Sequence, residues 1–337
     1  MECGNDGEGE TSVRTLITGA GGFVGRGLLR RLAESRRSGD VIIATDLAFE
    51  ETVPASGIHY RAGSIADPAH LQSLLSEPVD RVFHFATVAG VQQSDFALGK
   101  SVNLDATIAL LDLLSLQEVP ARLIYSSSVG VFGRPFPAVV DDDTLPAPPW
   151  SYGTHKLVCE YLITDYARAG RVDGLALRFP GIVARPEGSQ TMLSAFINNL
   201  FYAARDRRDF MLPLGAEDGT WLMSLRRCLD NVSLAAELDG ATLPARRAWT
   251  LPALFVTMRE LVDALAETYG TRVRDCISFA PVEAVQQLFA TVPLRAPGAE
   301  ALGLRSDATA LDLVRNVVAE NPALAPRRGA GGQGADR

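Results

Sequence analysis

The sequence has no block of clustered lysine and arginine and no long apolar run. Its 32 Lys and Arg residues are outnumbered by 40 Asp and Glu residues, and its formal net charge at pH 7 is −8. Nucleic acids and anionic membranes recruit proteins through clustered positive charge, so neither is an expected partner. No stretch approaches the ~18 consecutive apolar residues of a membrane span. A small molecule is therefore the expected ligand.

Cysteine is also scarce. The four cysteines, Cys3, Cys159, Cys228 and Cys276, are scattered along the chain without a CxxC pair. This spacing predicts neither a zinc site nor a disulfide framework, and it suits a reducing compartment. The first residues, MECGNDGEGE, are acidic and glycine-rich, unlike the basic and then apolar start of a secretory signal. We therefore expect a cytoplasmic protein.

Short β-branched runs alternate with longer helical patterns through the first half of the chain. VRTLIT, DVIIATD and DRVFHFAT are examples of such runs, and GFVGRGLLRRLAES is a helical pattern between two of them. This alternation predicts an α/β protein with a Rossmann-like, doubly wound parallel sheet and crossover helices. After Phe179 the pattern loosens, which predicts a smaller C-terminal region that binds substrate.

The expected boundaries follow from these patterns. Both ends of the chain are rich in Gly, Pro, Ala and charged residues, with too little apolar surface to order them. We therefore predict a disordered N-terminus at 1–12 and a disordered tail at 323–337. The dinucleotide-binding domain is expected at 13–180, joined by parts of 218–252, and the mainly substrate-binding region at 181–322.

The first predicted strand is followed by the glycine-rich segment TGAGGFVG, in which three glycines have the spacing of a dinucleotide-binding loop. Gly19 permits a tight turn, Gly22 lets the backbone approach a pyrophosphate, and Gly25 lets the next helix pack on the strand. A glycine-rich stretch alone also occurs in plain turns. Here it lies between a strand and a helix, and the second strand ends on Asp46, which favours dinucleotide binding. Because the Asp46 carboxylate would repel a 2′-phosphate, we expect NAD rather than NADP as the cofactor.

A second group of residues predicts proton transfer. Ser126, Ser127 and Ser128 end a strand, and Tyr152 and Lys156 follow on a predicted helix. Tyr and Lys at i and i+4 project from one helix face into one cleft. An adjacent ammonium and a cationic nicotinamide both favour the phenolate, so Tyr152 becomes a general acid or base, with Ser128 orienting the reacting oxygen. A lone Tyr-x-x-x-Lys is usually a packing or surface pair, but the glycine loop and the serines favour catalysis here.

These motifs together resemble the extended short-chain dehydrogenase/reductase family, also called the NAD-dependent epimerase/dehydratase family, over residues 13–320. The matching segments include TGAGGFVG, HFAT, VNLDAT, YSSSVGVFG and YGTHK. Within that family, DFALGKSVNLDAT, SSSVGVFGRPFPAVVDDDT and TLPALFVTM are similar to the branch of D-erythronate dehydrogenases. That branch oxidises the C2 hydroxyl of a four-carbon sugar acid to the 2-oxo acid with NAD.

The resemblance implies a role for each matching residue. Ser128, Tyr152 and Lys156 would be the catalytic set, with Lys156 also holding the nicotinamide ribose. Asn103 would support the active site from behind. The cofactor-binding residues would be Gly19, Gly22, Phe23, Val24, Asp46, Ser64, Ile65, Ala86, Thr87, Asn103, Tyr152, Lys156, Pro180 and Ile182. The substrate-binding residues would include Thr87, Ser127, Ser128 and Tyr152. The family commonly forms homodimers through two helices of each subunit, expected here at 95–116 and 151–170.

Some positions depart from the family pattern. Ser64 replaces an acidic residue that many relatives place beside the adenine. Nucleotide-sugar epimerases usually have Asn in the place of Gly181 and Arg in the place of Gly219, and both contact the nucleotide diphosphate there. Their absence favours a free sugar acid as substrate, although Gly219 also departs from the erythronate branch.

Other polar residues have weaker interpretations. Arg185 and Arg226 are candidate clamps for a substrate carboxylate, but surface salt bridges are the more frequent role of such arginines. Asp141–Asp143 are expected in a solvated loop, with no metal site. His84, inside an apolar strand, is expected to be a hydrogen-bonded buried imidazole.

The sequence therefore predicts an NAD-dependent dehydrogenase acting on a small sugar acid. A nucleotide-sugar 4-epimerase or dehydratase of the same family is the first alternative, since it would use the same Tyr and Lys. A non-catalytic NAD-binding module is the second, and the complete Ser128, Tyr152 and Lys156 set weighs against it.

Overall fold

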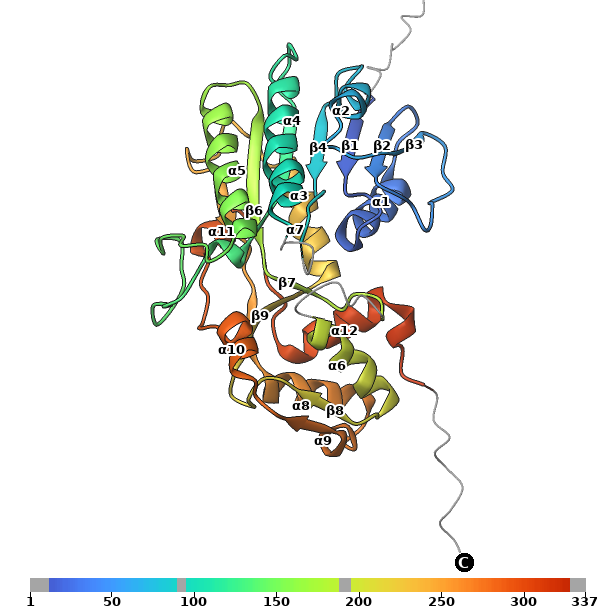
Figure 1. The fold of residues 1–337 in the computed structure, drawn as a ribbon. Helices are drawn as coiled ribbons and strands as arrows, with labels where there is room; N and C mark the ends of the chain where they lie inside the picture. The colour runs from blue at the N-terminus through green and yellow to red at the C-terminus, as the bar shows by residue number, and fades with distance from the viewer. Residues whose placement is uncertain (1–11, 90–94, 188–194, 328–337) are drawn as a thin grey trace, which may run out of the picture.

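A computed structural model describes residues 12–89, 95–187 and 195–327 of the chain. Two bodies stack on one another, with the N-terminal sheet and its helices above and a smaller helical body below (Figure 1). The predicted disordered N-terminus lies outside the described residues except for Ser12, and the predicted tail does so from 328 onward.

The larger body is built on a seven-stranded parallel sheet. The strand order is β10-β6-β5-β4-β1-β2-β3, so the order reverses between β1 and β4. In such sheets ligands bind beyond the carboxyl ends of the strands at the point of reversal. The strands are β1 (Arg14–Thr18), β2 (Val41–Asp46), β3 (Ile58–Ala62), β4 (Arg81–His84), β5 (Arg122–Ser128), β6 (Asp173–Phe179) and β10 (Ala248–Thr250).

Helices cover both faces of this sheet, which confirms the predicted doubly wound fold. Alternate strand residues point to opposite faces, so Ile17 joins one apolar core and Leu16 the other. The first core is covered by α1 (Phe23–Ser35) and α7 (Leu225–Glu237). The second is covered by α2 (Pro68–Leu74), α4 (Ala106–Leu114) and α5 (Ser151–Arg168). Short helical segments, α3 (Phe96–Lys100), η2 (Ser101–Asp105) and η3 (Val129–Val131), complete the connections.

The smaller body has its own apolar core. One sheet has the order β11-β9-β7 and another pairs β12 with β8. The strands are β7 (Gly181–Val183), β8 (Phe210–Leu212), β9 (Gly219–Ser224), β11 (Leu254–Thr257) and β12 (Ile277–Phe279). The helices are α6 (Ala195–Asp206), α8 (Met258–Tyr269), α9 (Val273–Cys276), α10 (Glu283–Phe289), α12 (Ala310–Glu320) and η4 (Pro322–Leu324).

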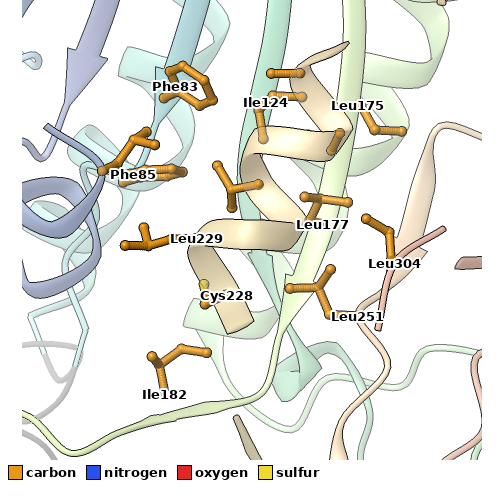
Figure 2. Close-up of a cluster of buried hydrophobic side chains, with 14 of the residues drawn as sticks. Phe83, Phe85, Ile124, Leu175, Leu177, Ile182, Cys228, Leu229, Leu251 and Leu304 are labelled. Carbon is orange, nitrogen blue, oxygen red and sulfur yellow. The ribbon is translucent and has the colours of Figure 1, made fainter. Parts of the chain in front are cut away.

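The chain crosses back into the larger body after residue 224. β10 pairs with β6, and α7 packs on the sheet, where Cys228 and Leu229 lie among strand side chains such as Ile124 and Leu177 (Figure 2). Both elements lie in the segment 218–252. A later part also joins this core, since α11 (Pro297–Ala301) and Leu304 pack there. The sequence pattern gave no sign of that return.

The C-terminal segment differs from the sequence interpretation at its beginning. Residues 323–327 were expected in a disordered tail, yet Leu324 is fully buried in the smaller core. The Tyr269 hydroxyl donates to the Leu324 carbonyl at 2.8 Å. A single leucine in a stretch rich in Ala and Pro gives no periodic signal, so its burial depends on a site that distant residues build.

The state of the cysteines and the lengths of the helices bear on where the protein is located. Cys159, Cys228 and Cys276 are all free thiols. Over the residues the structure describes, no helix has the length and apolar character needed to cross a bilayer. A cytoplasmic location stays a prediction.

Candidate active site

The glycine loop connects β1 to α1 at the reversal point of the sheet. Gly19 has a φ of +71°, and a Cβ there would lie 2.6 Å from the backbone nitrogen of Ala86. A Cβ at Gly25 would lie 2.1 Å from the Gly19 carbonyl oxygen. Both contacts exclude any larger residue. Gly22 is the N-cap of α1, so Phe23 and Val24 begin a helix whose first N–H groups lack helical partners. The loop therefore fits a pyrophosphate.

Asp46 lies beside this loop at the carboxyl end of β2. One carboxylate oxygen accepts a hydrogen bond from Gly21 N–H at 2.9 Å, and the other accepts one from Leu47 N–H at 2.7 Å. These bonds hold the carboxylate next to the glycine loop, where a ribose diol would reach it. The position agrees with the ribose contact expected from the sequence, which stays a prediction.

The next turn, after β3, lies beside Asp46. The Ser64 hydroxyl accepts a hydrogen bond from Ala66 N–H at 3.2 Å, which is a bond within this turn. The side chain of Ile65 is buried. A Cβ at Gly63 would lie 2.5 Å from the ring of His70. The sequence pattern did not single out this imidazole, which also contacts the hydroxyl of Thr45 at 2.9 Å.

Asn103 supports the segment that follows β4. Its side-chain oxygen accepts from Thr87 Oγ1 at 2.9 Å and from Val88 N–H at 2.7 Å. Its amide nitrogen donates to the Val88 carbonyl at 2.9 Å. Asn103 is buried, and both ends of its amide are occupied by this segment, so it lies behind the site. Thr87 is exposed, and Ala86 lies against the glycine loop.

Ser128 and Tyr152 meet where β5 ends and α5 begins. Ser128 is the last residue of β5, and its hydroxyl is close enough to the Tyr152 phenol to lower the pKa of that phenol. Their approach depends on two glycines, since a Cβ at Gly153 would lie 2.2 Å from the carbonyl oxygen of Gly130. The first turn of α5 can therefore press against the segment after β5.

Lys156 lies one turn further along α5 and is buried. Its Nζ donates to the Ser126 carbonyl at 2.6 Å and lies 5.8 Å from the centre of the Tyr152 ring. Burial lowers the pKa of the Lys156 ammonium to about 8, while Cys159 and Glu160 act in the opposite direction. The i and i+4 spacing thus brings both side chains to one place.

The pKa of Tyr152 does not follow the sequence expectation. Burial raises it, because a phenolate is poorly solvated there, while the Ser128 hydrogen bond and the positive charge of Arg185 lower it. The sequence interpretation assigned that lowering to the Lys156 ammonium together with a cationic nicotinamide. The structure instead points to Ser128 and Arg185 as the groups that oppose the effect of burial.

Arg185 follows β7 in the smaller body, and its charge acts on the pKa of Tyr152 in the larger one. Its guanidinium lies 5.3 Å over the ring of Phe23, and burial lowers its pKa. In the described part of the chain it forms no ion pair with an acidic side chain. Arg226, the other candidate clamp, is exposed on α7.

Pro180 is buried between β6 and β7. Ile182 is buried within β7 and joins the core of the larger body.

Ser127 was expected to contact substrate, but the structure does not bring it to the site. Successive strand residues point to opposite sides, and the Ser127 hydroxyl donates to Glu160. Glu160 also forms an ion pair with Arg178 at 2.8 Å, and both are buried. The sequence carried a signal for this pair, because Arg178 interrupts an otherwise apolar strand.

His84 is a hydrogen-bonded buried imidazole, as the sequence predicted. Its two ring nitrogens contact Thr18 Oγ1 at 2.6 Å and Thr107 Oγ1 at 3.0 Å. Burial lowers its pKa to about 3, so the ring is neutral at physiological pH. Within the described ranges, no cluster of three or more His, Cys, Asp or Glu side chains has the arrangement of a metal site.

Gly219 begins β9, and the ring of Phe255 occupies the space beside it. A Cβ at Gly219 would lie 2.2 Å from Phe255 Cζ. A long side chain at this position would therefore displace the ring. At Gly181 the restriction is weaker, since a Cβ would lie 3.1 Å from Leu222 Cδ2.

Comparison with known proteins agrees with this arrangement. Residues 15–219 match the NAD dependent epimerase/dehydratase family. A D-erythronate dehydrogenase of Cupriavidus necator is 33% identical, over 90% of this chain and 97% of that protein. A D-erythronate dehydrogenase of Haemophilus influenzae is 29% identical, over 87% of this chain and 94% of that protein.

The fold is also similar to that of a solved relative. The crystal structure of a nucleoside-diphosphate-sugar epimerase from Agrobacterium tumefaciens has a TM-score of 0.87 and 26% identity, covering 94% of this chain and 96% of that one. From the family match, the extent of these similarities and the glycine loop, we conclude that the chain belongs to the NAD-dependent epimerase/dehydratase family and is an NAD-dependent oxidoreductase.

Proposed function

We propose that this enzyme oxidises the C2 hydroxyl of a small sugar acid, similar to D-erythronate, to the 2-oxo acid. One observation carries the proposal: the guanidinium of Arg185 lies 5.3 Å over the ring of Phe23 at the glycine loop, where its charge lowers the pKa of Tyr152, and it has no acidic partner among the described residues. A mostly buried guanidinium needs a compensating anion, and a substrate carboxylate binds it bidentately. The relatives named D-erythronate dehydrogenase support the same substrate class.

The cofactor would lie across the reversal point of the sheet. The cradle at Gly19, which a Cβ would fill, fits the pyrophosphate, and the Asp46 carboxylate fits the adenosine ribose. When bound, NAD supplies the acceptor for the hydride that leaves C2. The chain supplies the proton acceptor and the groups that orient the substrate.

Tyr152 takes the hydroxyl proton in this proposal. The C2–H bond breaks as a hydride leaves, the O–H bond breaks as the proton passes to the Tyr152 oxygen, and a C=O bond forms. Ser128, whose hydroxyl lowers the pKa of Tyr152, holds the reacting oxygen. Arg185 holds the carboxylate and, through its charge, lowers the pKa of the phenol.

The alternative is a nucleotide-sugar 4-epimerase or dehydratase, and the similarity to the Agrobacterium epimerase favours it. The Phe255 ring weighs against it, because the family's diphosphate-binding Arg would stand at Gly219, where that ring leaves no room. A non-catalytic NAD-binding module is less well supported, since Ser128 and Tyr152 both lie against Gly130 and the buried Lys156 lies 5.8 Å from the centre of the Tyr152 ring.

Substitution of Tyr152 tests the function. Tyr152→Phe keeps the ring and removes the proton acceptor, so kcat with D-erythronate should fall by on the order of 10²-fold or more while NAD binding stays nearly unchanged. The matched control is Tyr161→Phe on the exposed face of the same helix, which should leave kcat unchanged. NADH formation with a panel of C4 to C6 aldonic and uronic acids is the measurement.

Two results would overturn the proposal. Normal turnover by Tyr152→Phe would remove Tyr152 from catalysis. If the native enzyme ignored every free sugar acid and instead interconverted UDP-sugars without net NADH release, the epimerase function would replace this one.

We also propose that the enzyme is a homodimer. Phe96 and Leu98 on α3 and Val158 and Tyr161 on α5 expose large apolar side chains, and α3 contacts α5. These residues, named here the α3/α5 patch, lie in the two segments expected to pair with a second copy.

A further inference from the structure

We propose that Asn198 and Tyr202 of α6 are positioning residues that hold Arg185 in place, with its guanidinium over the Phe23 ring at the glycine loop. This inference rests on the proposed role of Arg185 as the carboxylate clamp. It adds that α6, a helix of the smaller body, helps to set the affinity of the enzyme for its substrate.

Both polar groups of the Arg185 backbone are held by one helix. Arg185 N–H donates to Asn198 Oδ1 at 3.0 Å, and the Tyr202 hydroxyl donates to the Arg185 carbonyl at 3.0 Å. Asn198 and Tyr202 are 4% and 1% exposed. They are i and i+4 on α6, so both project from the same face.

Arg185 needs these partners because it lies beyond the end of β7. That strand stops at Val183, so sheet hydrogen bonds do not hold the following residues. A buried backbone N–H or carbonyl without a partner is strongly disfavoured. The two α6 side chains supply both bonds. They thereby fix the position of the Arg185 backbone, from which its side chain extends.

The direction of the Tyr202 proton is also determined. Asn321 Nδ2 donates to the Tyr202 oxygen at 3.0 Å, and Asn321 Oδ1 accepts from Ala323 N–H at 3.1 Å, which orients the amide. Because Tyr202 receives that bond, its single proton is free for the Arg185 carbonyl. The end of α12 thus contributes to the position of a residue at the active site.

The first test is Tyr202→Phe, which removes only the hydroxyl. We expect KM for the sugar acid to rise about threefold to tenfold, as for loss of one buried hydrogen bond, with kcat and NAD affinity nearly unchanged. The matched control is Tyr269→Phe, since that buried hydroxyl bonds the Leu324 carbonyl in the same core and does not touch Arg185. The control should leave KM unchanged.

A second variant weakens the bond between the Tyr202 hydroxyl and the Arg185 carbonyl without changing Tyr202 itself. Asn321→Asp keeps an oxygen for Ala323 N–H and replaces the amide donor by a carboxylate acceptor. The Tyr202 proton should then turn toward the carboxylate, and KM should rise as in Tyr202→Phe. Equal KM values for Tyr202→Phe, Tyr269→Phe and the native enzyme would overturn the inference.

A double-mutant cycle separates positioning from general destabilisation. Arg185→Gln should raise KM strongly, and adding Tyr202→Phe to it should raise KM no further, because the clamp is already absent. A further rise in the double variant would contradict a role through Arg185. If Arg185→Gln itself left KM unchanged, the carboxylate clamp of the proposed function would fail. If Arg185→Gln raised KM and Tyr202→Phe did not, only the positioning role would fail.

Discussion

Lys156 carries its ammonium inside the larger body, with 1% of its surface exposed. Its partners are a carbonyl oxygen and the faces of Tyr125 and Tyr152, and it forms no ion pair with a described carboxylate. Burial of a charge without an ion partner destabilises the folded state, which is why its pKa falls from 10.5 to about 8. In the proposed mechanism, Lys156 therefore serves catalysis at the expense of stability.

We therefore predict that Lys156→Met stabilises the fold and abolishes turnover. The pKa shift from 10.5 to about 8 corresponds to roughly 3 kcal/mol at neutral pH, and loss of the Ser126 hydrogen bond offsets part of it. The free energy of unfolding at pH 7 should rise by about 1 to 3 kcal/mol, measured by urea denaturation.

The pH dependence provides the internal control. Between the folded and unfolded pKa values of Lys156, the unfolded chain binds a proton that the folded chain has lost, so native stability rises with pH there. The advantage of Lys156→Met should be full below pH 8 and shrink toward pH 10.5. An advantage that does not vary with pH would show that packing, and not charge burial, is responsible.

At the scale of elements, the cofactor region is a strand, a tight turn and a helix. β2 places Asp46 at its carboxyl end because the apolar run VIIATD is buried up to that residue. Its carboxylate then bonds Gly21 N–H in the turn after β1. Two adjacent parallel strands thus bring together the acid proposed to bind the ribose and the loop proposed to bind the pyrophosphate.

We predict that Asp46→Asn weakens the preference for NAD over NADP. The amide keeps an oxygen for Gly21 N–H but removes the charge that repels a 2′-phosphate, so the ratio of the two affinities should shift by about tenfold or more toward NADP. Fluorescence titration with NADH and NADPH measures it. Asp67→Asn, a neighbouring exposed helix cap that keeps its acceptor, is the control. An unchanged ratio, or comparable affinities in the native enzyme, would refute the role of Asp46.

At the scale of the whole molecule, the α3/α5 patch is a surface that the sheet leaves uncovered. Tyr161 is 66% exposed and Phe96 is 62% exposed. The Phe96 ring lies 6.1 Å from that of His155 on α5, so the two helices form one continuous face. Two copies related by a twofold axis would each cover the patch of the other.

Sedimentation of Tyr161→Glu tests this assembly. A buried carboxylate at a twofold interface faces its own copy and is disfavoured, so the variant should be a monomer at micromolar concentration while the native enzyme is a dimer. Met211→Glu, an exposed apolar position on β8, should remain a dimer. If the native enzyme were a monomer at that concentration, the proposed homodimer would be wrong.

The sequence by itself determined the features that depend on local spacing. The alternation of strands and helices predicted the doubly wound sheet, and the glycine spacing placed the turn at Gly19. The i and i+4 spacing placed Tyr152 and Lys156 on one face of α5. Each of these follows from the repeat of a helix or strand, or from the end of a strand, and needs no knowledge of distant residues.

Only the tertiary structure decided which distant side chains share a space. It brought Arg185 to Tyr152, turned Ser127 toward Glu160, and filled the space beside Gly219 with Phe255. It also linked Asn321 through Tyr202 to Arg185. Periodicity records which face of an element is apolar, but not which residue of another element packs there. That choice depends on the packing of the two bodies, which no local pattern contains.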